Sequence, residues 1–169
     1  LDMMGIPYSS CSQVSSTITF DKVSTKRAVA ERGINVAKEI FLHKGEEFSA
    51  EVIAEELGLP HFVKPNASGS GFGVTRVTEV EQIEEAVRLA FTESDEVLIE
   101  ECITGREFGC GVLIAKSKAL VLPITEIVSK NAFFDYEAKY TAGMSDEITP
   151  APISEEWADM LAHDAVEAY

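Results

Sequence analysis

The segment His61-Phe-Val-Lys-Pro-Asn-Ala-Ser-Gly-Ser-Gly-Phe-Gly73 joins a short apolar strand to a loop rich in glycine and serine. The strand carries one lysine, Lys64, and the loop has glycines at positions 69, 71 and 73. Because glycine has no Cβ, the N–H groups of such a loop can turn toward an anion, while the lysine supplies positive charge. The next residues, Val-Thr-Arg-Val77, alternate like a second strand. We therefore predict a strand–loop–strand unit whose loop closes over phosphate groups.

The glycine spacing is not that of the two best-known phosphate loops. A Walker A loop ends in Gly-Lys-Ser/Thr, and a dinucleotide fingerprint lies between a strand and a helix. A glycine-rich hairpin that serves only as a turn is the alternative interpretation.

Composition is that of an ordinary soluble globular protein with one domain or two small ones. The chain has 169 residues, of which 46% are hydrophobic and 25% charged, and this length suffices to bury a core. The formal net charge of −15 argues against nucleic acid as a partner, because phosphate backbones favour basic surfaces. A nucleotide is not excluded, since a small basic cluster and a divalent cation can neutralise one triphosphate.

The sequence shows no signal for a membrane or for secretion, so a cytoplasmic location is expected. No apolar run approaches the roughly 18 residues that span a bilayer, and Leu1-Asp-Met-Met lacks the basic start of a signal peptide. The cysteines at 11, 102 and 110 are odd in number and lack metal-binding spacing, so reduced thiols and no metal site are expected. Cys102 and Cys110 are expected to be small strand residues.

Helices are predicted from caps and apolar periodicity. Asp21 precedes a helix over 22–32 that Gly33 ends, and Ser49 opens a short one, closed by Gly58, with Val52, Ile53 and Leu57 inward. Thr78-x-x-Glu81 is a capping box before a stripe at positions 80, 83, 87 and 90. Ser154 is expected to cap a last helix with Trp157 in the core and Leu161, Ala165 and Ala168 on the same face.

Strands are expected at 36–42, 96–103, 107–115 and 119–128, with a hairpin tip at Ser117-Lys118 and a long loop over 129–152. Adjacent strand pairs with helices between the pairs favour an α+β fold over a doubly wound sheet. Both ends resemble interrupted elements, so we expect the chain to be the middle of a longer protein.

Two charged or aromatic segments are candidates for function. Glu100-Glu101-Cys-Ile-Thr-Gly-Arg-Glu107 places acids at the end of one strand and the start of the next; for Glu101 and Arg106 we prefer solvated charges. Phe133-Phe-Asp-Tyr-Glu-Ala-Lys-Tyr140 concentrates four aromatic residues in an expected loop. This loop either packs on its own domain or forms a lid over a site.

Several segments together resemble the D-alanine–D-alanine ligases of the ATP-grasp superfamily. They cover nearly the whole chain in the family's order, and Asp135-Tyr-Glu-Ala-Lys-Tyr140 is the most specific of them. The other matching segments are Gly5-Ile-Pro-Tyr8, Asp21-Lys22 with Lys26, Gly58-Leu-Pro, Val63-Lys-Pro65 with the glycine loop, Glu100 with Gly105-Arg-Glu-Phe108, Leu122-Pro-Ile-Thr-Glu-Ile127 and Pro150-Ala-Pro.

The resemblance implies an ATP-grasp fold, in which two α+β lobes with mainly antiparallel sheets grip ATP. It divides the chain into the end of an N-terminal domain and a linker (1–18), a central lobe with the glycine loop (19–103), and an incomplete C-terminal lobe with the lid loop (104–169). It implies that ATP and Mg²⁺ (or Mn²⁺) activate the carboxylate of one D-alanine as an acyl phosphate. The amine of a second D-alanine attacks this intermediate, which makes a dipeptide for peptidoglycan precursors.

The resemblance also implies roles for individual residues. Lys26 and Lys64 contact ATP phosphates, and the loop over 68–73 (Ser68, Gly69, Ser70, Gly71 and Gly73) closes over them. Glu100 and the backbone of Glu101, Cys102 and Ile103 face adenine, and Glu107 holds the ribose. Lys139 neutralises the transferred phosphoryl group. Ser70 and Tyr140 hydrogen-bond across the closed site and exclude water.

The sequence departs from the family pattern at three places. Ser68 and Gly71 stand where the family usually has Glu and Ser, and Glu101 replaces a common lysine. The family's metal-binding residues and a catalytic arginine are expected beyond Tyr169, and a substrate-orienting glutamate before Leu1. We therefore expect the whole protein, a homodimer, to be an enzyme, and this piece alone to be inactive.

Two alternatives stay open. One is another ATP-grasp carboxylate–amine ligase or a depsipeptide ligase of the D-Ala-D-Lac type, although Tyr140 favours the dipeptide enzyme. The other is a nucleotide-binding module without catalysis.

Overall fold

The computed structural model describes residues 1–115, 118–130, 141 and 143–169. They form two compact units, of which the first comprises residues 1–28 and 36–102 and the second residues 29–35 and 103–169. The helices of the first unit are the 3-10 turns η1 (Asp2–Met4) and η2 (Val80–Gln82), α1 (Gln13–Phe20), α2 (Lys22–Ala30), α3 (Ala50–Leu57) and α4 (Ile83–Glu93). Its strands are β1 (Glu39–His43), β2 (His61–Pro65), β3 (Thr75–Val77) and β4 (Glu96–Glu101).

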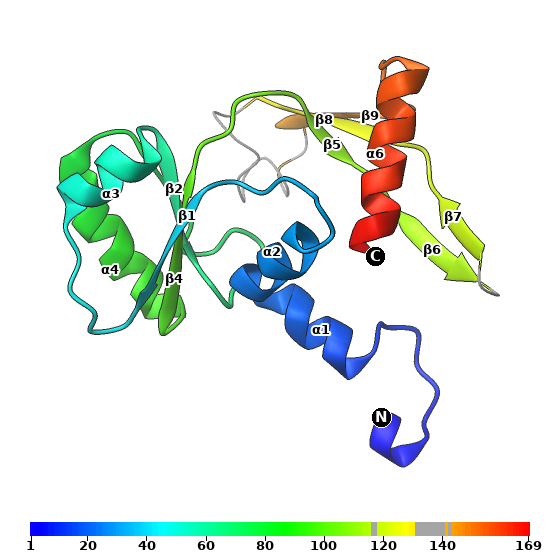
Figure 1. Ribbon diagram of the computed structural model, residues 1–169, viewed down its shortest axis with the longest axis horizontal. Coiled ribbons are helices and arrows are strands. Elements are labelled where there is room, and N and C mark those ends of the chain that lie inside the picture. Colours follow the sequence, from blue (N-terminus) through cyan, green and yellow to red (C-terminus); the bar gives the residue numbers. More distant parts are fainter. Residues whose placement is uncertain (116–117, 131–140, 142) are drawn as a thin grey trace. The chain divides into compact units, whose positions relative to one another are not determined.

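The four strands of the first unit form one antiparallel sheet in the order β1-β4-β2-β3. Helices α3 and α4 lie on one side of this sheet and α2 on the other (Figure 1). The face toward α3 and α4 holds the core, where apolar strand residues meet the inward residues of both helices. The core residues are Leu42, Ala50, Ile53, Leu57, Val63, Val77, Ile83, Ala86, Val87, Ala90, Val97 and Ile99.

Local signals predicted most of this unit correctly. Asp21 caps α2 through a 2.7 Å hydrogen bond from the Ser24 N–H to its Oδ1, and Ser49 caps α3. The strand–loop–strand unit is confirmed, because β2 and β3 pair as antiparallel neighbours on either side of the glycine loop. The capping box is displaced by one residue, to Glu79 and Gln82.

Three predictions about the first unit were wrong. Helix α1 was not predicted, because its sequence, Gln-Val-Ser-Ser-Thr-Ile-Thr-Phe, is rich in residues of low helix propensity. Helix α2 ends at Ala30 rather than at residue 32. Val52 points outward and is 56% exposed, since Ile53 and Leu57 already fill the inward face of α3.

The second unit contains two small antiparallel sheets and one helix. The three-stranded sheet has the order β5-β8-β9, with β5 over Glu107–Gly109, β8 over Thr125–Ser129 and β9 over Ser145–Ile148. The two-stranded sheet pairs β6 (Val112–Ala115) with β7 (Lys118–Val121), and helix α6 spans Glu155–Ala168 after the predicted cap Ser154. Of its described residues, only Ile124 and Glu126 are buried.

The predicted long strands of this unit were wrong. The run 107–115 divides into β5 and β6, which belong to different sheets, and the run 119–128 divides into β7 and β8. Both runs bend at residues that disfavour a continuous strand, Gly109 with Gly111 in the first and Pro123 in the second. Strand β9 lies inside the predicted loop over 129–152.

Two smaller predictions in this region were also wrong. Trp157 is 48% exposed rather than core. Cys102 and Cys110 lie just outside strands, and all three cysteines are free thiols.

The fold class itself is confirmed, since both units combine helices with antiparallel sheets. In the described part of the chain, no helix has both the length and the apolar character needed to cross a bilayer.

Candidate active site

The charged residues of the first unit gather on the sheet face opposite the apolar core. Side chains alternate along each strand, so Phe62 and Lys64 of β2 share one face, and their cross-strand partners Glu100 and Leu98 lie on that face too. Strand β4 pairs with β2 along one edge and with β1 along the other. On β1, Glu39 is the cross-strand partner of Glu100. Helix α2 covers this face, so its lysines lie above the strand carboxylates.

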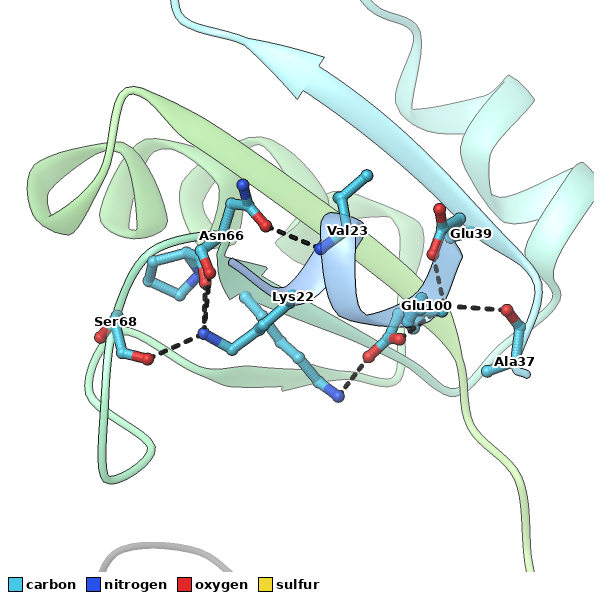
Figure 2. A network of polar contacts seen from close by, with 10 residues as sticks. Lys22, Val23, Ala37, Glu39, Asn66, Ser68 and Glu100 are labelled. Carbon is cyan, nitrogen blue, oxygen red and sulfur yellow. Dashed lines mark hydrogen bonds and ion pairs between the residues drawn. The ribbon is translucent and has the colours of Figure 1, made fainter. Parts of the chain in front are cut away.

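Lys26 lies between the two facing carboxylates. Its Nζ is 2.5 Å from Glu39 Oε2 and 2.7 Å from Glu100 Oε1, and it donates to the Ala37 carbonyl oxygen at 2.9 Å (Figure 2). Like charges placed directly across a sheet repel each other. The ammonium of Lys26 offsets this repulsion, which explains why two glutamates are tolerated side by side.

Lys64 binds the other oxygen of the same carboxylate. Its Nζ donates to Glu100 Oε2, and the ammonium also lies 5.4 Å from the centre of the Phe62 ring. The Lys64 side chain keeps 27% of its surface exposed, compared with 13% for Lys26. Two lysines from distant segments therefore meet on one carboxylate.

The pKa of Glu100 reflects this arrangement. Burial alone would raise the pKa, but the charge of Lys64 and the hydrogen bonds from Lys26 and Lys64 together outweigh it, so the pKa lies below its usual 4.5. Glu100 is therefore ionised at neutral pH. The site thus pairs two carboxylates, those of Glu39 and Glu100, with two lysines, Lys26 and Lys64.

The glycine loop over 68–73 is built from consecutive tight turns. The Phe72 N–H donates to the Gly69 carbonyl at 3.1 Å and the Val74 N–H to the Gly71 carbonyl at 3.3 Å. Ser70, Gly71 and Gly73 have φ values of 57°, 84° and 70°. Ser70 is the one non-glycine residue of the described chain with positive φ, and such strain often occurs at functional sites.

Gly73 is where the loop returns to the sheet, and it has no space for a side chain. A Cβ there would lie 2.7 Å from Cγ of the buried Pro65 and 3.0 Å from Cγ of Glu93. We expect Gly73→Ala to destabilise the closed turns by about 2–4 kcal/mol, from the positive φ together with the clash. Faster hydrogen exchange at the Phe72 and Val74 amides would report this loss.

Gly69 offers the matched control for that substitution. A Cβ at Gly69 meets nothing within 4 Å, and its φ lies outside the left-handed region. Gly69→Ala should therefore leave exchange at the two reporter amides close to that of the unsubstituted protein. Equal exchange in the two variants would contradict the role given to the Gly73 contact.

The segment after Glu100 was predicted to present its backbone to adenine. The Glu101 N–H donates to the Lys38 carbonyl at 3.1 Å, and the Cys102 N–H donates to the Pro60 carbonyl at 3.3 Å. The Glu101 carboxylate accepts from the Lys38 N–H at 2.7 Å, so it is not a simply solvated charge as predicted. Ile103 is 70% exposed. The N–H groups of Glu101 and Cys102 are thus used within the protein, and the role of this segment at adenine stays a prediction.

The structure describes only some of the predicted site residues of the second unit. Glu107 is exposed at the start of β5, opposite Ile127 of β8. Lys139 and Tyr140 lie outside the described residues, as does the whole predicted lid segment 133–140. Lys26 and Lys64 thus meet on Glu100, whereas a nucleotide site between them and a place for Lys139 beside them stay predictions.

Arg106 is exposed, as expected of a solvated charge, but it also forms an ion pair that was not predicted. It binds the buried carboxylate of Glu126 with two hydrogen bonds, of 2.6 and 2.8 Å, and donates to the Pro152 carbonyl at 3.1 Å. The hydrogen bond from Arg106 lowers the pKa of Glu126. This bidentate pair ties β5 and β8 to the segment before α6, which is a structural role.

Comparison with known proteins gives the chain its family. Residues 28–169 match the family model of the D-ala D-ala ligase C-terminus. The chain belongs to the D-alanine–D-alanine ligase family. It is 51% identical, over 95% of its length and 50% of the relative's, to the D-alanine–D-alanine ligase of Azobacteroides pseudotrichonymphae genomovar. CFP2. The chain thus spans about half the length of the curated relatives it matches.

Solved structures of family members share this fold. The VanG D-Ala:D-Ser ligase of Enterococcus faecalis aligns with a TM-score of 0.80 at 34% identity, over 99% of this chain and 49% of that one. The D-alanine–D-alanine ligase of Bacillus anthracis, solved in complex with ATP, aligns with a TM-score of 0.78 at 30% identity, over 99% of this chain and 52% of that one. The predicted ATP-grasp fold is therefore confirmed.

Sequence reasoning missed three residues of this site. Glu39 shares Lys26 with Glu100, Asn66 is buried at the root of the glycine loop, and Lys22 contacts that root from α2. Lys22 stands in the matching Asp21-Lys22 segment, but no role followed from its position in the sequence. Two surface hollows, of about 570 and 390 Å³, are lined by none of the predicted site residues.

Proposed function

We propose that the whole protein joins two D-alanines into D-alanyl-D-alanine, at the expense of ATP and through an acyl phosphate, for peptidoglycan precursors. Family membership over residues 28–169 supports this activity, as do the names of relatives about half identical to the chain. The B. anthracis relative solved with ATP supports ATP as a substrate.

The observation that carries the proposal is the meeting of Lys26 and Lys64 on the single carboxylate of Glu100. Phosphoryl transfer asks the protein mainly to position groups and to neutralise charge. Two ammonium groups that share one counter-ion, next to a glycine-rich loop, meet this requirement. Triphosphate oxygens would compete with Glu100 and Glu39 for the same lysines.

The other roles follow from family resemblance and stay proposals. Residues 68–73 close over the phosphates, Glu100 with residues 101–103 faces adenine, and Glu107 holds the ribose. Lys139 neutralises the transferred phosphoryl group. A Ser70–Tyr140 hydrogen bond keeps water from the acyl phosphate.

Mg²⁺ or Mn²⁺ would neutralise phosphate charge in such a reaction. Within the described residues, no group of three or more His, Cys, Asp or Glu side chains is placed to hold a metal ion. We therefore assign no residue of this chain to the metal and propose that its ligands lie elsewhere in the whole protein. We further propose a cytoplasmic homodimer that binds neither nucleic acid nor membrane, consistent with the net charge of −15.

The activity is tested by measuring ADP release from the full-length protein with ATP and Mg²⁺. We expect release to depend on D-alanine and the product to be the dipeptide. Parallel reactions supply D-lactate or D-serine together with D-alanine, to test for a depsipeptide ligase and for the activity in the name of the VanG relative. Preference for either second substrate at neutral pH would overturn the assignment, and ATP binding without turnover would favour a module without catalysis.

A further inference from the structure

Glu39 is the carboxylate of the charged face that depends on a single side chain. Its Oε2 lies 2.5 Å from the Nζ of Lys26. This oxygen is buried, and within the described residues it has no hydrogen bond to any other group. A buried carboxylate is costly unless it is paired. The position of Glu39 and that of Lys26 are therefore linked.

Lys26 is held mainly from the side of β1. An ammonium group has three N–H donors, and the Nζ of Lys26 contacts three oxygens (Figure 2). Two of them belong to Glu39, on β1, and to Ala37, just before β1. The third is Oε1 of Glu100 on β4, at 2.7 Å. Glu39 and Ala37 thus draw the ammonium to the β1 side of Glu100.

The sheet register places a different environment on the other side of Glu100. The cross-strand partners of Glu100 are Glu39 on β1 and Phe62 on β2, so an aromatic ring lies where β1 has a carboxylate. Lys64 reaches Glu100 from a position on β2 that is nearer to the glycine loop. A ligand that approaches Glu100 from the side of Phe62 therefore meets its carboxylate with the Lys26 ammonium held behind it.

The charge next to a purine decides which 6-substituent is accepted. Adenine carries an amino donor at position 6, whereas guanine carries an oxo acceptor there. An ionised carboxylate only accepts hydrogen bonds, and an ammonium only donates them. Glu100 therefore favours the amino group and repels the oxo group. Lys26 would do the opposite if its ammonium reached the base.

We propose that Glu39 is a positioning residue that holds Lys26 away from the base and so makes the nucleotide site selective for 6-aminopurines over 6-oxopurines. The inference rests on the proposed function, in which Glu100 faces adenine. Glu39 does not touch the nucleotide and acts through Lys26. Without the charge of Glu39, the ammonium of Lys26 is drawn toward Glu100 and the base.

The test compares Glu39→Gln with the unsubstituted full-length protein by calorimetric titration with ATP and with ITP, each with Mg²⁺. ITP carries an oxo group in place of the 6-amino group of ATP. We expect the ratio of the ITP Kd to the ATP Kd to fall about tenfold in Glu39→Gln, which corresponds to about 1.4 kcal/mol. The lost negative charge also strengthens the attraction for phosphates, but this effect is common to both nucleotides and cancels in the ratio. A loosened fold would likewise weaken both nucleotides alike.

Two further variants show whether the effect passes through Lys26. In a Lys26→Met background, Glu39→Gln should leave the ratio unchanged, because the group that Glu39 positions is already absent. Asp95→Asn is the matched control, since it also removes a carboxylate from a lysine partner, at the surface of the same unit. It should leave the ratio equal to that of the unsubstituted protein.

The proposal is overturned if Glu39→Gln leaves the ratio unchanged or binds neither nucleotide, or if the ratio falls equally with and without Lys26. The titrations do not require ligation. A protein that binds ATP but releases no ADP with D-alanine would therefore refute the proposed activity while the role of Glu39 was still decided. An unsubstituted protein that binds neither nucleotide would refute both.

Discussion

Replacing Lys64 with methionine is expected to lower kcat/KM for ATP by about 10²–10³-fold, the usual effect of removing one preorganised charge from a reacting group. Lys64 lies on a strand fixed on both sides by β3 and β4, so its ammonium is held in place before any nucleotide arrives. Its side chain is more exposed than that of Lys26 and therefore more accessible to a phosphate. Steady-state kinetics of the full-length protein, with ATP varied at saturating D-alanine, measure the effect.

The Lys64 variant must remain folded for this result to be informative. Glu100 keeps Lys26 as a partner when Lys64 is lost, so the exchange of the β4 amides should change little. Lys64→Arg should recover part of the rate by restoring positive charge. Lys44→Met should retain full activity, because Lys44 pairs only with Asp95 at the surface of the same unit. Near-normal ATP kinetics in Lys64→Met would refute the phosphate-binding role of Lys64.

The first unit was largely predictable because its signals are local. Asp21 and Ser49 precede helices as caps, and the buried positions of β2 and α4 repeat with the periods of a strand and a helix. A family resemblance that rests on short motifs was also visible in the sequence. These features depend on residues within a few positions of one another.

The relations that define the candidate site are non-local. Glu39 and Glu100 face each other because β1 and β4 pair in one particular register, which nothing near either residue specifies. Lys22 contacts carbonyls that follow it by more than forty residues. A lysine on the same helix as Lys26 and Arg27 has the sequence signature of a solvated side chain, so its contacts emerge only from the fold.

The second unit was predicted less well because apolar runs there do not reveal where a strand changes sheet. Residues 107–115 look like one strand in the sequence, because apolar and β-branched residues recur along them. The chain nevertheless leaves one sheet and enters another around Cys110. Trp157 illustrates the same difficulty, since an apolar stripe on α6 suggests a core that its described neighbours do not supply.

Glu100→Gln is expected to destabilise the first unit by about 3 kcal/mol at pH 7, because it removes the charge that Lys26 and Lys64 share in a mostly buried place. Glutamine keeps the volume of the side chain, so the effect comes from charge rather than from a cavity. Hydrogen exchange of the Leu98 and Ile99 amides, corrected for intrinsic rates, gives the free energy of opening. Glu85→Gln is the matched control, because Glu85 is an exposed partner of Arg88 on α4 and should leave these amides nearly unchanged.

The pH dependence of the same difference distinguishes charge from packing. The pKa of Glu100 in the folded protein lies below its ordinary value of 4.5, so its stabilising contribution is fully present above about pH 4.5. As the pH falls through the lowered pKa, Glu100 gains a proton and the contribution is lost. The gap in opening free energy between the unsubstituted protein and Glu100→Gln should therefore narrow below pH 4.5. A gap that stays constant from pH 7 to pH 3 would show that glutamine disturbs packing, and that the ion pairs on Glu100 do not hold α2 to the sheet.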